Sequence, residues 1–395
     1  MEQRDTTGRR PLLSLCMIVK NEEKLLPRAL ASALPWVDEV VVVDTGSSDA
    51  TREVARKLGA RVFDDPWRND FARHRNRSLD LARGEWVLIL DADEELDQQE
   101  APRLRRALEE TGGEGFLLRV LNHLPGGNQS TRLAPRLFRN LPHLRFTGRY
   151  PERLPYGEDW QRLEVTIIHH GYALDSLTMA RKAQGRLEMV NQWVEAEPDN
   201  FLAHLHLANT LLAAFPGREK KALDHGLTAF QLVQQSQVPR EQWPRVLHTV
   251  LVALSRLGLD QELYQMARVC QDLFPSWPDP LLAQVLAAQG LERWQELCRA
   301  ARRFLALQEC WTANPWEYPH DLNTTLGREK EALFHWCLAA AHLGMTGEAM
   351  QVFQRLEAEP GSAELVQSAL DQLREMGLAQ LADQLAGEPL LSAAG

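Results

Sequence analysis

Residues 86–95 read WVLILDADEE, an apolar run that ends in a cluster of acidic side chains. A short and nearly continuous apolar run is typical of a strand buried on both faces of a parallel sheet. In open α/β sheets, ligands bind in the crevice outside the carboxyl ends of the strands, which is where this acidic cluster falls. The stretch therefore predicts a buried strand that delivers Asp91 and Asp93 to a ligand-binding edge.

The same pattern occurs twice upstream, at residues 12–19 (LLSLCMIV) and 39–43 (EVVVV). Each apolar run is followed by a polar turn and then by a segment whose apolar residues recur at helical spacing. The alternation predicts right-handed crossovers and a largely parallel sheet with helices on both sides. The other elements expected in this part are helices over 24–34, 50–58 and 71–82 and a strand over 60–63.

The pattern changes beyond residue 115. Short β-like stretches at 115–121 and 164–168 are separated by turns rich in glycine and proline, at Pro125-Gly126-Gly127 and 151–157. We assign them to the acceptor side of the same domain. After Leu174 we expect no further strand and only helical hairpins.

The helical part contains a weak internal repeat. A turn glycine, two apolar or small positions and a closing proline recur at nearly equal offsets, a pattern that resembles the tetratricopeptide (TPR) repeat. Such helix pairs stack because one pair cannot bury its apolar face alone. The two copies are Gly258, Leu263, Ala267, Pro275 and Gly344, Ala349, Phe353, Pro360, with a degenerate copy at Gly217, Ala222 and Gly226. We therefore expect a flexible N-terminus over 1–11, an α/β domain over 12–175 and an all-α TPR-like domain over 176–395.

Bulk properties agree with two globular domains. The chain has 395 residues, 44% of them apolar and 25% charged, which is enough to form cores and a wetted surface. A net charge of −10 argues against a nucleic-acid partner. The five cysteines are widely spaced, which predicts reduced thiols rather than disulfides or zinc. Since no signal segment or long apolar run is present, we expect a soluble, cytoplasmic protein.

Asp91 and Asp93 flank one small residue at a strand end. Hard divalent cations take oxygen ligands, and Mg²⁺ usually uses one or two carboxylates together with phosphate oxygens of the substrate. The pair therefore predicts a cation site. The alternative is a solvated acidic turn that caps the next helix.

Asp44 ends the second strand, where a carboxylate can accept hydrogen bonds from a nucleobase or ribose. It can instead start an Asx-turn before the following helix, and the two roles are compatible. Val19, Asn21 and Glu22 follow the neighbouring strand, so topology places them beside Asp44. Three polar strand ends that converge favour a ligand site.

Four segments together resemble family 2 glycosyltransferases that carry a C-terminal TPR-like domain. They read LSLCMIVKNEEKLLPRAL, VDEVVVVDTGSSDATREVARKLGARVF, DFARHRNRSLDLARGEWVLILDADEEL and RLFRNLPHLRFTGR. The likeness is close over residues 12–97 and looser over 136–152 and 169–172. It implies a GT-A fold that binds a nucleoside diphosphate sugar, with a uridine nucleotide favoured.

The resemblance also implies roles for single residues. Val19, Asn21, Glu22 and Asp44 would line the nucleoside site, and Asp91 would contact the nucleotide sugar as well as the metal. Arg75 and Asn76 would lie beside the diphosphate, although the basic run around them also fits a solvated helix face. Asp91 and Asp93 would form the DxD site for Mg²⁺ or Mn²⁺.

Two further residues are candidates for the chemistry. Glu152 is our candidate for the general base, in a stretch where the family tends to have G-R-x-H-E. This chain reads Gly148-Arg149-Tyr150-Pro151-Glu152, with proline in place of the histidine. His169 matches a His-x-Gly-Tyr segment and would be a third metal ligand or a phosphate contact; a lone histidine at a strand end more often packs or forms a hydrogen bond.

These observations predict a metal-dependent, inverting sugar transfer to a peptide, protein or glycan acceptor. The helical domain would present a peptide, mediate homodimerisation, or both. A different class of function is a non-catalytic scaffold that senses a nucleotide, for which Pro151 is the best argument. A nucleotidyltransferase is the third alternative, but the chain lacks the glycine-rich phosphate loop that such enzymes favour.

Overall fold

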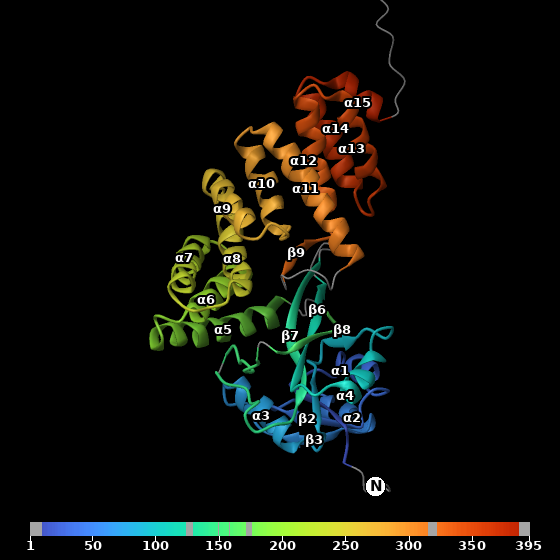
Figure 1. The fold of residues 1–395 in the computed structure, drawn as a ribbon, viewed down its shortest axis with the longest axis vertical. Coiled ribbons are helices and arrows are strands. Elements are labelled where there is room, and N and C mark those ends of the chain that lie inside the picture. Colours follow the sequence, from blue (N-terminus) through green and yellow to red (C-terminus); the bar gives the residue numbers. More distant parts are fainter. Residues whose placement is uncertain are drawn as a thin grey trace, which may run out of the picture. The chain divides into compact units, whose positions relative to one another are not determined.

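The computed structural model describes residues 10–123, 129–148, 150–157, 159–170, 176–314 and 322–386, with the backbone alone over 176–182. These residues form two compact units, one from residues up to 123 and from 131 to 190, the other mainly from 191 to 386. Figure 1 shows a sheet with helices in the first unit and stacked helices in the second. Residues 1–9, the predicted turn Pro125-Gly126-Gly127 and Gly171-Tyr172 of the histidine segment lie outside the described residues.

The first unit is built on a mixed sheet with the strand order β3-β2-β1-β4-β7-β6-β8-β5. Its strands are β1 (Leu13–Val19), β2 (Glu39–Asp44), β3 (Arg61–Asp64), β4 (Trp86–Ile89), β5 (Glu94–Leu96), β6 (Gly115–His123), β7 (Gln129–Arg139) and β8 (Gln161–His169). The first four strands are parallel, whereas β7 runs antiparallel to β4 and β5 antiparallel to β8. The predicted α/β fold of the GT-A type is confirmed.

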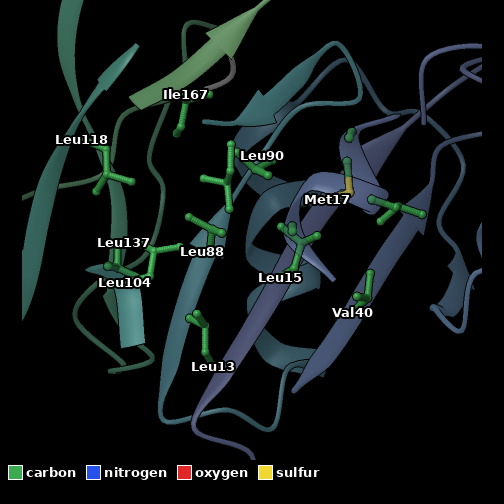
Figure 2. Packing of buried hydrophobic residues seen from close by; sticks show 14 of the residues in the cluster. Leu13, Leu15, Met17, Val40, Leu88, Leu90, Leu104, Leu118, Leu137 and Ile167 are labelled. Carbon is green, nitrogen blue, oxygen red and sulfur yellow. The ribbon is translucent and has the colours of Figure 1, made fainter. Parts of the chain in front are cut away.

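Helices cover both faces of this sheet. Along β1, Leu13, Leu15 and Met17 pack on the face covered by α1 (Leu26–Ala33), α2 (Thr51–Lys57) and α4 (Arg103–Glu110). Figure 2 shows this core, with Leu88 and Leu90 beside β1 and Leu118, Leu137 and Ile167 farther along the sheet. On the other face, Cys16 packs with residues of α3 (Phe71–Leu81). Burial of each leucine stabilises the fold by about 1.5–3 kcal/mol. Because successive side chains of β1 are buried on opposite faces of the sheet, this packing holds the strand ends in place.

The elements predicted over residues 12–90 are all present, with ends that differ by up to two residues. Strand β6 and strand β8 also occur where β-like stretches were expected. Prediction missed β5, because only four residues separate it from β4 and its sequence is acidic. It also missed β7, which lies between β6 and the distant strand β4 in the sheet.

The second unit is a stack of helices. From α6 onward each helix packs on the next, and each of α6, α8, α10 and α12 also packs on the second helix after it, as in a helical solenoid. Its helices, with α5 shared between the units, are α5 (Ser176–Ala196), α6 (Phe201–Ala214), α7 (Glu219–Gln235), the 3₁₀ turn η2 (Arg240–Gln242), α8 (Trp243–Arg256), α9 (Asp260–Leu273), α10 (Asp279–Gly290), α11 (Trp294–Ala313), α12 (Glu329–His342), α13 (Thr346–Ala358), α14 (Ala363–Glu375) and α15 (Ala379–Leu385). The TPR-like helical region is confirmed.

The turn glycines of the predicted repeat close hairpins. Gly258 between α8 and α9 has φ +65°, and Gly344 between α12 and α13 has φ +71°, a backbone region that favours glycine. The hairpin of α10 and α11 uses Glu292 at φ +55° instead, which explains why the repeat is weak in the sequence. The expectation of no strand after Leu174 is wrong, since β9 spans Asn323–Leu326. The domain limits at 11/12 and 175/176 remain predictions.

Two expectations about the whole chain concern membranes and thiols. In the described part of the chain, no helix is both long and apolar enough to cross a membrane. All five cysteines are free thiols, four of them buried and Cys310 exposed, as predicted.

Candidate active site

The predicted nucleoside edge of the site lies where β1 and β2 end. Val19 and Asp44 are paired in the parallel register of the two strands. The Val19 side chain is buried in the core, and its carbonyl accepts hydrogen bonds from the Thr45 N–H (2.9 Å) and Thr45 Oγ1 (3.1 Å). Val19 therefore fixes the two strand ends relative to each other.

Asn21 and Glu22 join the first turn to the turn after β2. The Asn21 N–H donates to Ser47 Oγ (2.9 Å), and Asn21 Oδ1 accepts from the Ser48 N–H (2.8 Å). The Glu22 N–H donates to Thr51 Oγ1 (2.8 Å). Asn21 has φ +58°, which asparagine tolerates better than most residues. The structure thus brings Val19, Asn21, Glu22 and Asp44 to one edge.

The Asp44 carboxylate has one engaged oxygen and one without a donor. Oδ1 accepts from the N–H groups of Gly46 (3.1 Å) and Ser47 (2.9 Å), so the Asx-type turn is present. Oδ2 is buried and has no hydrogen-bond partner within the described residues. A buried acceptor without a donor costs about 1–3 kcal/mol, so this oxygen suits a donor on a ligand.

The DxD turn follows β4, with β1 between it and β2. The Glu94 N–H donates to the Asp91 carbonyl (3.1 Å), which closes a tight turn. Asp91 Oδ1 accepts from Arg75 Nη2 (2.9 Å), and Asp91 Oδ2 lies 3.6 Å from Arg136 Nη2. Burial raises the pKa of Asp91, but Arg75 and Arg136 outweigh that effect and hold it below the ordinary value. Asp91 is therefore a carboxylate held between two cations.

Arg75, on α3, connects Asp91 with Glu152. Its Nε donates to Glu152 Oε1 at 2.6 Å while Nη2 contacts Asp91. Only 8% of the residue is exposed, so Arg75 is not part of a solvated helix face. Burial lowers the pKa of Arg75, but the two carboxylates raise it above its ordinary value. Three separate segments thus meet at one guanidinium.

Asn76, the neighbour of Arg75, serves another contact. Its Nδ2 donates to the Phe146 carbonyl (2.8 Å), and its Oδ1 accepts from the Phe146 N–H (2.7 Å). The side chain therefore fixes the segment before Glu152, whereas its predicted contact with a diphosphate stays a prediction.

Asp93 lies beside His169 at the end of β8. His169 Nε2 is 3.3 Å from Asp93 Oδ2, and His169 Nδ1 is 2.9 Å from Asn122 Oδ1. Burial lowers the pKa of His169, but the hydrogen bond and charge of Asp93 raise it above the ordinary value. His170, the next residue, pairs instead with Glu95 (2.8 Å). Of the two histidines, His169 is the one that faces the DxD turn.

The residues present fit a divalent cation that is also bound by substrate. Within the described residues, no three His, Cys, Asp or Glu side chains gather closely enough to form a metal site by themselves. Asn122 accepts from Nδ1 of His169 and so directs Nε2 towards Asp93, as in histidine ligands held by an outer partner. Carboxylates with one imidazole suit Mn²⁺, and diphosphate oxygens would complete the coordination.

Sequence reasoning missed Glu94, Arg136 and Asn122. Arg136 reaches Asp91 from β7, and Asn122 reaches His169 from β6, so both contacts depend on strand pairing between distant segments. The available signal was Arg136 in the RLFR motif, which lies in one of the segments that resemble the family.

A mostly parallel sheet with carboxylates at the carboxyl ends of β2 and β4 fits the GT-A class of fold. Residues 14–174 match the family model described as glycosyl transferase family 2.

Three relatives illustrate the likeness. A TPR repeat-containing protein of Synechococcus elongatus is 36% identical over 199 residues, which cover 48% of this chain and 49% of that protein. The glycosyltransferase SunS of the SPbeta prophage of Bacillus subtilis is 24% identical over 234 residues, 54% of this chain and 52% of that protein. An uncharacterised glycosyltransferase of Rickettsia typhi is 40% identical over 87 residues, 22% of this chain and 30% of that protein. The chain spans about half, or less, of the length of these relatives.

Among solved structures, similarity is found to glucosyl-3-phosphoglycerate synthase from Mycobacterium tuberculosis, in complex with Mn²⁺, uridine diphosphate and glucosyl-3-phosphoglycerate. The identity is 28%, the match covers 28% of this chain and 44% of that chain, and the TM-score is 0.24.

Proposed function

We propose that the first unit transfers a sugar from a nucleoside diphosphate sugar to an acceptor, with inversion at the anomeric carbon. The family match over residues 14–174 supports the class of reaction. The observation that carries the proposal is Arg75, which joins the donor-side carboxylate Asp91 to the acceptor-side carboxylate Glu152. Donor and acceptor would therefore be bound on either side of Arg75.

The donor would be a uridine nucleotide. Asp44 Oδ2 is an acceptor without a donor, and the imide N–H of uracil would supply one, whereas cytosine presents an acceptor at the same position. Asn21 and Glu22 lie at the same edge and would line the nucleoside, and Arg75 would contact the diphosphate. A Mg²⁺ or Mn²⁺ ion held by Asp91, Asp93 and His169 would stabilise the charge on the departing diphosphate.

Glu152 would act as the general base. The acceptor heteroatom attacks the anomeric carbon, the bond from that carbon to the diphosphate oxygen breaks, and the acceptor proton passes to a Glu152 oxygen. The nucleoside diphosphate leaves with the bonding electrons. Glu152 accepts from Arg75 through Oε1, so Oε2 is the oxygen we assign to this proton transfer.

The acceptor and the location of the protein are also proposals. We propose a peptide, protein or glycan acceptor, with the helical unit presenting a peptide or mediating homodimerisation, and a cytoplasmic location. A scaffold without catalysis is the second candidate. It is favoured by Pro151 in place of the family histidine and by the short contact of Glu152 with Arg75.

The test is nucleotide release from a panel of nucleotide sugars with Mn²⁺, Mg²⁺ or EDTA. We expect release with a uridine diphosphate sugar, loss in EDTA, and a decrease of about 100-fold or more for D93A. E152Q should lower transfer by about 100-fold or more while it preserves donor binding. The control is E95Q, which removes a nearby carboxylate that pairs with His170 and Arg28 instead. If the wild type binds and releases no donor and D93A changes nothing, the scaffold replaces the enzyme.

A further inference from the structure

The two oxygens of Asp91 have different surroundings. Oδ1 accepts a hydrogen bond from Arg75 at 2.9 Å, while Oδ2 lies 3.6 Å from Arg136 Nη2, beyond hydrogen-bond distance. Oδ2 is therefore the Asp91 oxygen that remains for a cation.

Arg136 is held by a different carboxylate. Its Nη2 donates to Glu94 Oε1 at 2.6 Å, and the exposed fractions of Arg136 and Glu94 are 8% and 3%. Glu94 Oε2 accepts from the Asp91 N–H at 2.9 Å. Glu94 thus binds the backbone of the DxD turn with one oxygen and the Arg136 guanidinium with the other.

This arrangement determines which carboxylate Arg136 pairs with. A buried guanidinium requires a charged partner, and Asp91 is the next carboxylate within reach when Glu94 is neutral. Arg136 would then move onto Asp91 Oδ2, where its positive charge would repel a divalent cation and its N–H groups would occupy the oxygen.

We propose that Glu94 is a positioning residue that holds Arg136 away from Asp91 Oδ2 and so keeps this oxygen available for the divalent cation. The inference rests on the proposed function, because it assigns Asp91 to that cation. It adds two residues, Glu94 and Arg136, that act through Asp91 and touch neither the sugar nor the acceptor.

The test measures Mn²⁺ binding to the full chain by the electron paramagnetic resonance signal of free Mn²⁺, at saturating uridine diphosphate. We expect E94Q to weaken Mn²⁺ binding by about tenfold or more. The double variant E94Q/R136M should restore binding to within about threefold of wild type, because the competing guanidinium is gone. R136M alone should bind Mn²⁺ at least as well as wild type.

The matched control is the pair Arg139 and Glu85, the same residue types in an ion pair between the last residue of β7 and the residue just before β4. E85Q and R139M should leave Mn²⁺ binding unchanged. Thermal unfolding of every variant is recorded, and if E94Q does not fold, R136M and the double variant, which lacks both charges, still test the idea.

The outcomes distinguish a failure of the proposed function from a failure of the inference about Glu94. If wild type binds no Mn²⁺ with any nucleoside diphosphate, the proposed function fails and the inference with it. If wild type binds Mn²⁺ but E94Q binds equally well, the inference alone is overturned. A loss of binding in R136M, or a double variant as weak as E94Q, would also overturn it.

Discussion

Asp44 combines an observed structural role with the binding role that we propose for it. Its Oδ1 holds the turn after β2 through two backbone N–H groups, while its buried Oδ2 has no donor in the described structure. Because the first contact orients the carboxylate, the second oxygen is presented in a fixed direction. Such preorganisation reduces the free energy needed to order the site upon binding.

We predict that D44N changes the choice of base. An asparagine can donate from its amide to the acceptor nitrogen of cytosine, whereas aspartate can only accept. The variant should bind uridine diphosphate about tenfold or more weakly than wild type. Its affinity for uridine diphosphate relative to cytidine diphosphate should therefore decrease. Calorimetric titration of both nucleotides measures this. Equal losses for both nucleotides, or no loss, would contradict the role of Asp44 in base recognition.

The residues at strand ends could be predicted from the sequence because a parallel sheet aligns the carboxyl ends of its strands. The positions of Asp44 and Asp91 at strand ends could be predicted from the apolar runs before them alone. Glu94 and Arg136 could not be predicted in this way, since their contact requires the antiparallel pairing of β7 with β4. Periodicity along one segment carries no information about such pairing.

At the scale of elements, β9 is the clearest case of a strand without a local signal. Its residues Asn323–Leu326 are mostly polar, and hydrogen bonds to helices hold them in place. Asp279, on α10, accepts from Thr324 Oγ1 (2.7 Å) and Thr325 Oγ1 (3.0 Å). Gln308, on α11, donates to the Thr325 carbonyl (2.8 Å). Tertiary contacts therefore determine this strand, which is why the sequence pattern missed it.

We predict that D279A destabilises the second unit by about 2 kcal/mol or more, because several buried donors lose their acceptor. Urea denaturation followed by circular dichroism measures the free energy of unfolding. The control is D272A, at an exposed position on the neighbouring helix α9, which should change the free energy by about 0.5 kcal/mol or less. Equal effects of the two substitutions would show that the Asp279 contacts contribute little.

Helix α12 contains a partly buried histidine, with a buried Nδ1, that should make stability depend on pH. Burial lowers the pKa of His335 to about 4, with Glu331 opposing and Arg328 assisting the shift, and its Nδ1 has no partner in the described structure. The unfolded chain, with the ordinary value of 6.5, binds more protons between these limits. Stability is therefore lost as the pH falls from about 6.5 to about 4.

We predict that H335L removes this part of the pH dependence. The difference in unfolding free energy between wild type and variant should change by up to about 3 kcal/mol between pH 7 and pH 4. Denaturant unfolding at a series of pH values measures it. Parallel curves for the two proteins would mean that His335 does not titrate as described.

At the scale of the whole molecule, each unit contains its own buried core. The first unit packs its sheet against helices on both faces, and the second buries residues such as Val233 and Val246 between successive helices. We predict two calorimetric transitions. Uridine diphosphate with Mn²⁺ should raise the midpoint temperature of only one of them, since a ligand stabilises the unit that binds it. A single transition that shifts as a whole would contradict this expectation.

The contact of Arg75 with both Asp91 and Glu152 has a consequence for anyone who wishes to redesign this protein. Replacing the loop around residue 152 to accommodate a new acceptor would also deprive Arg75 of one of its two anions. The Arg75 guanidinium would then form an ion pair with Asp91 alone. Under the proposed function, acceptor and donor preferences are therefore chemically linked, and libraries that vary position 152 should vary position 75 in the same clones.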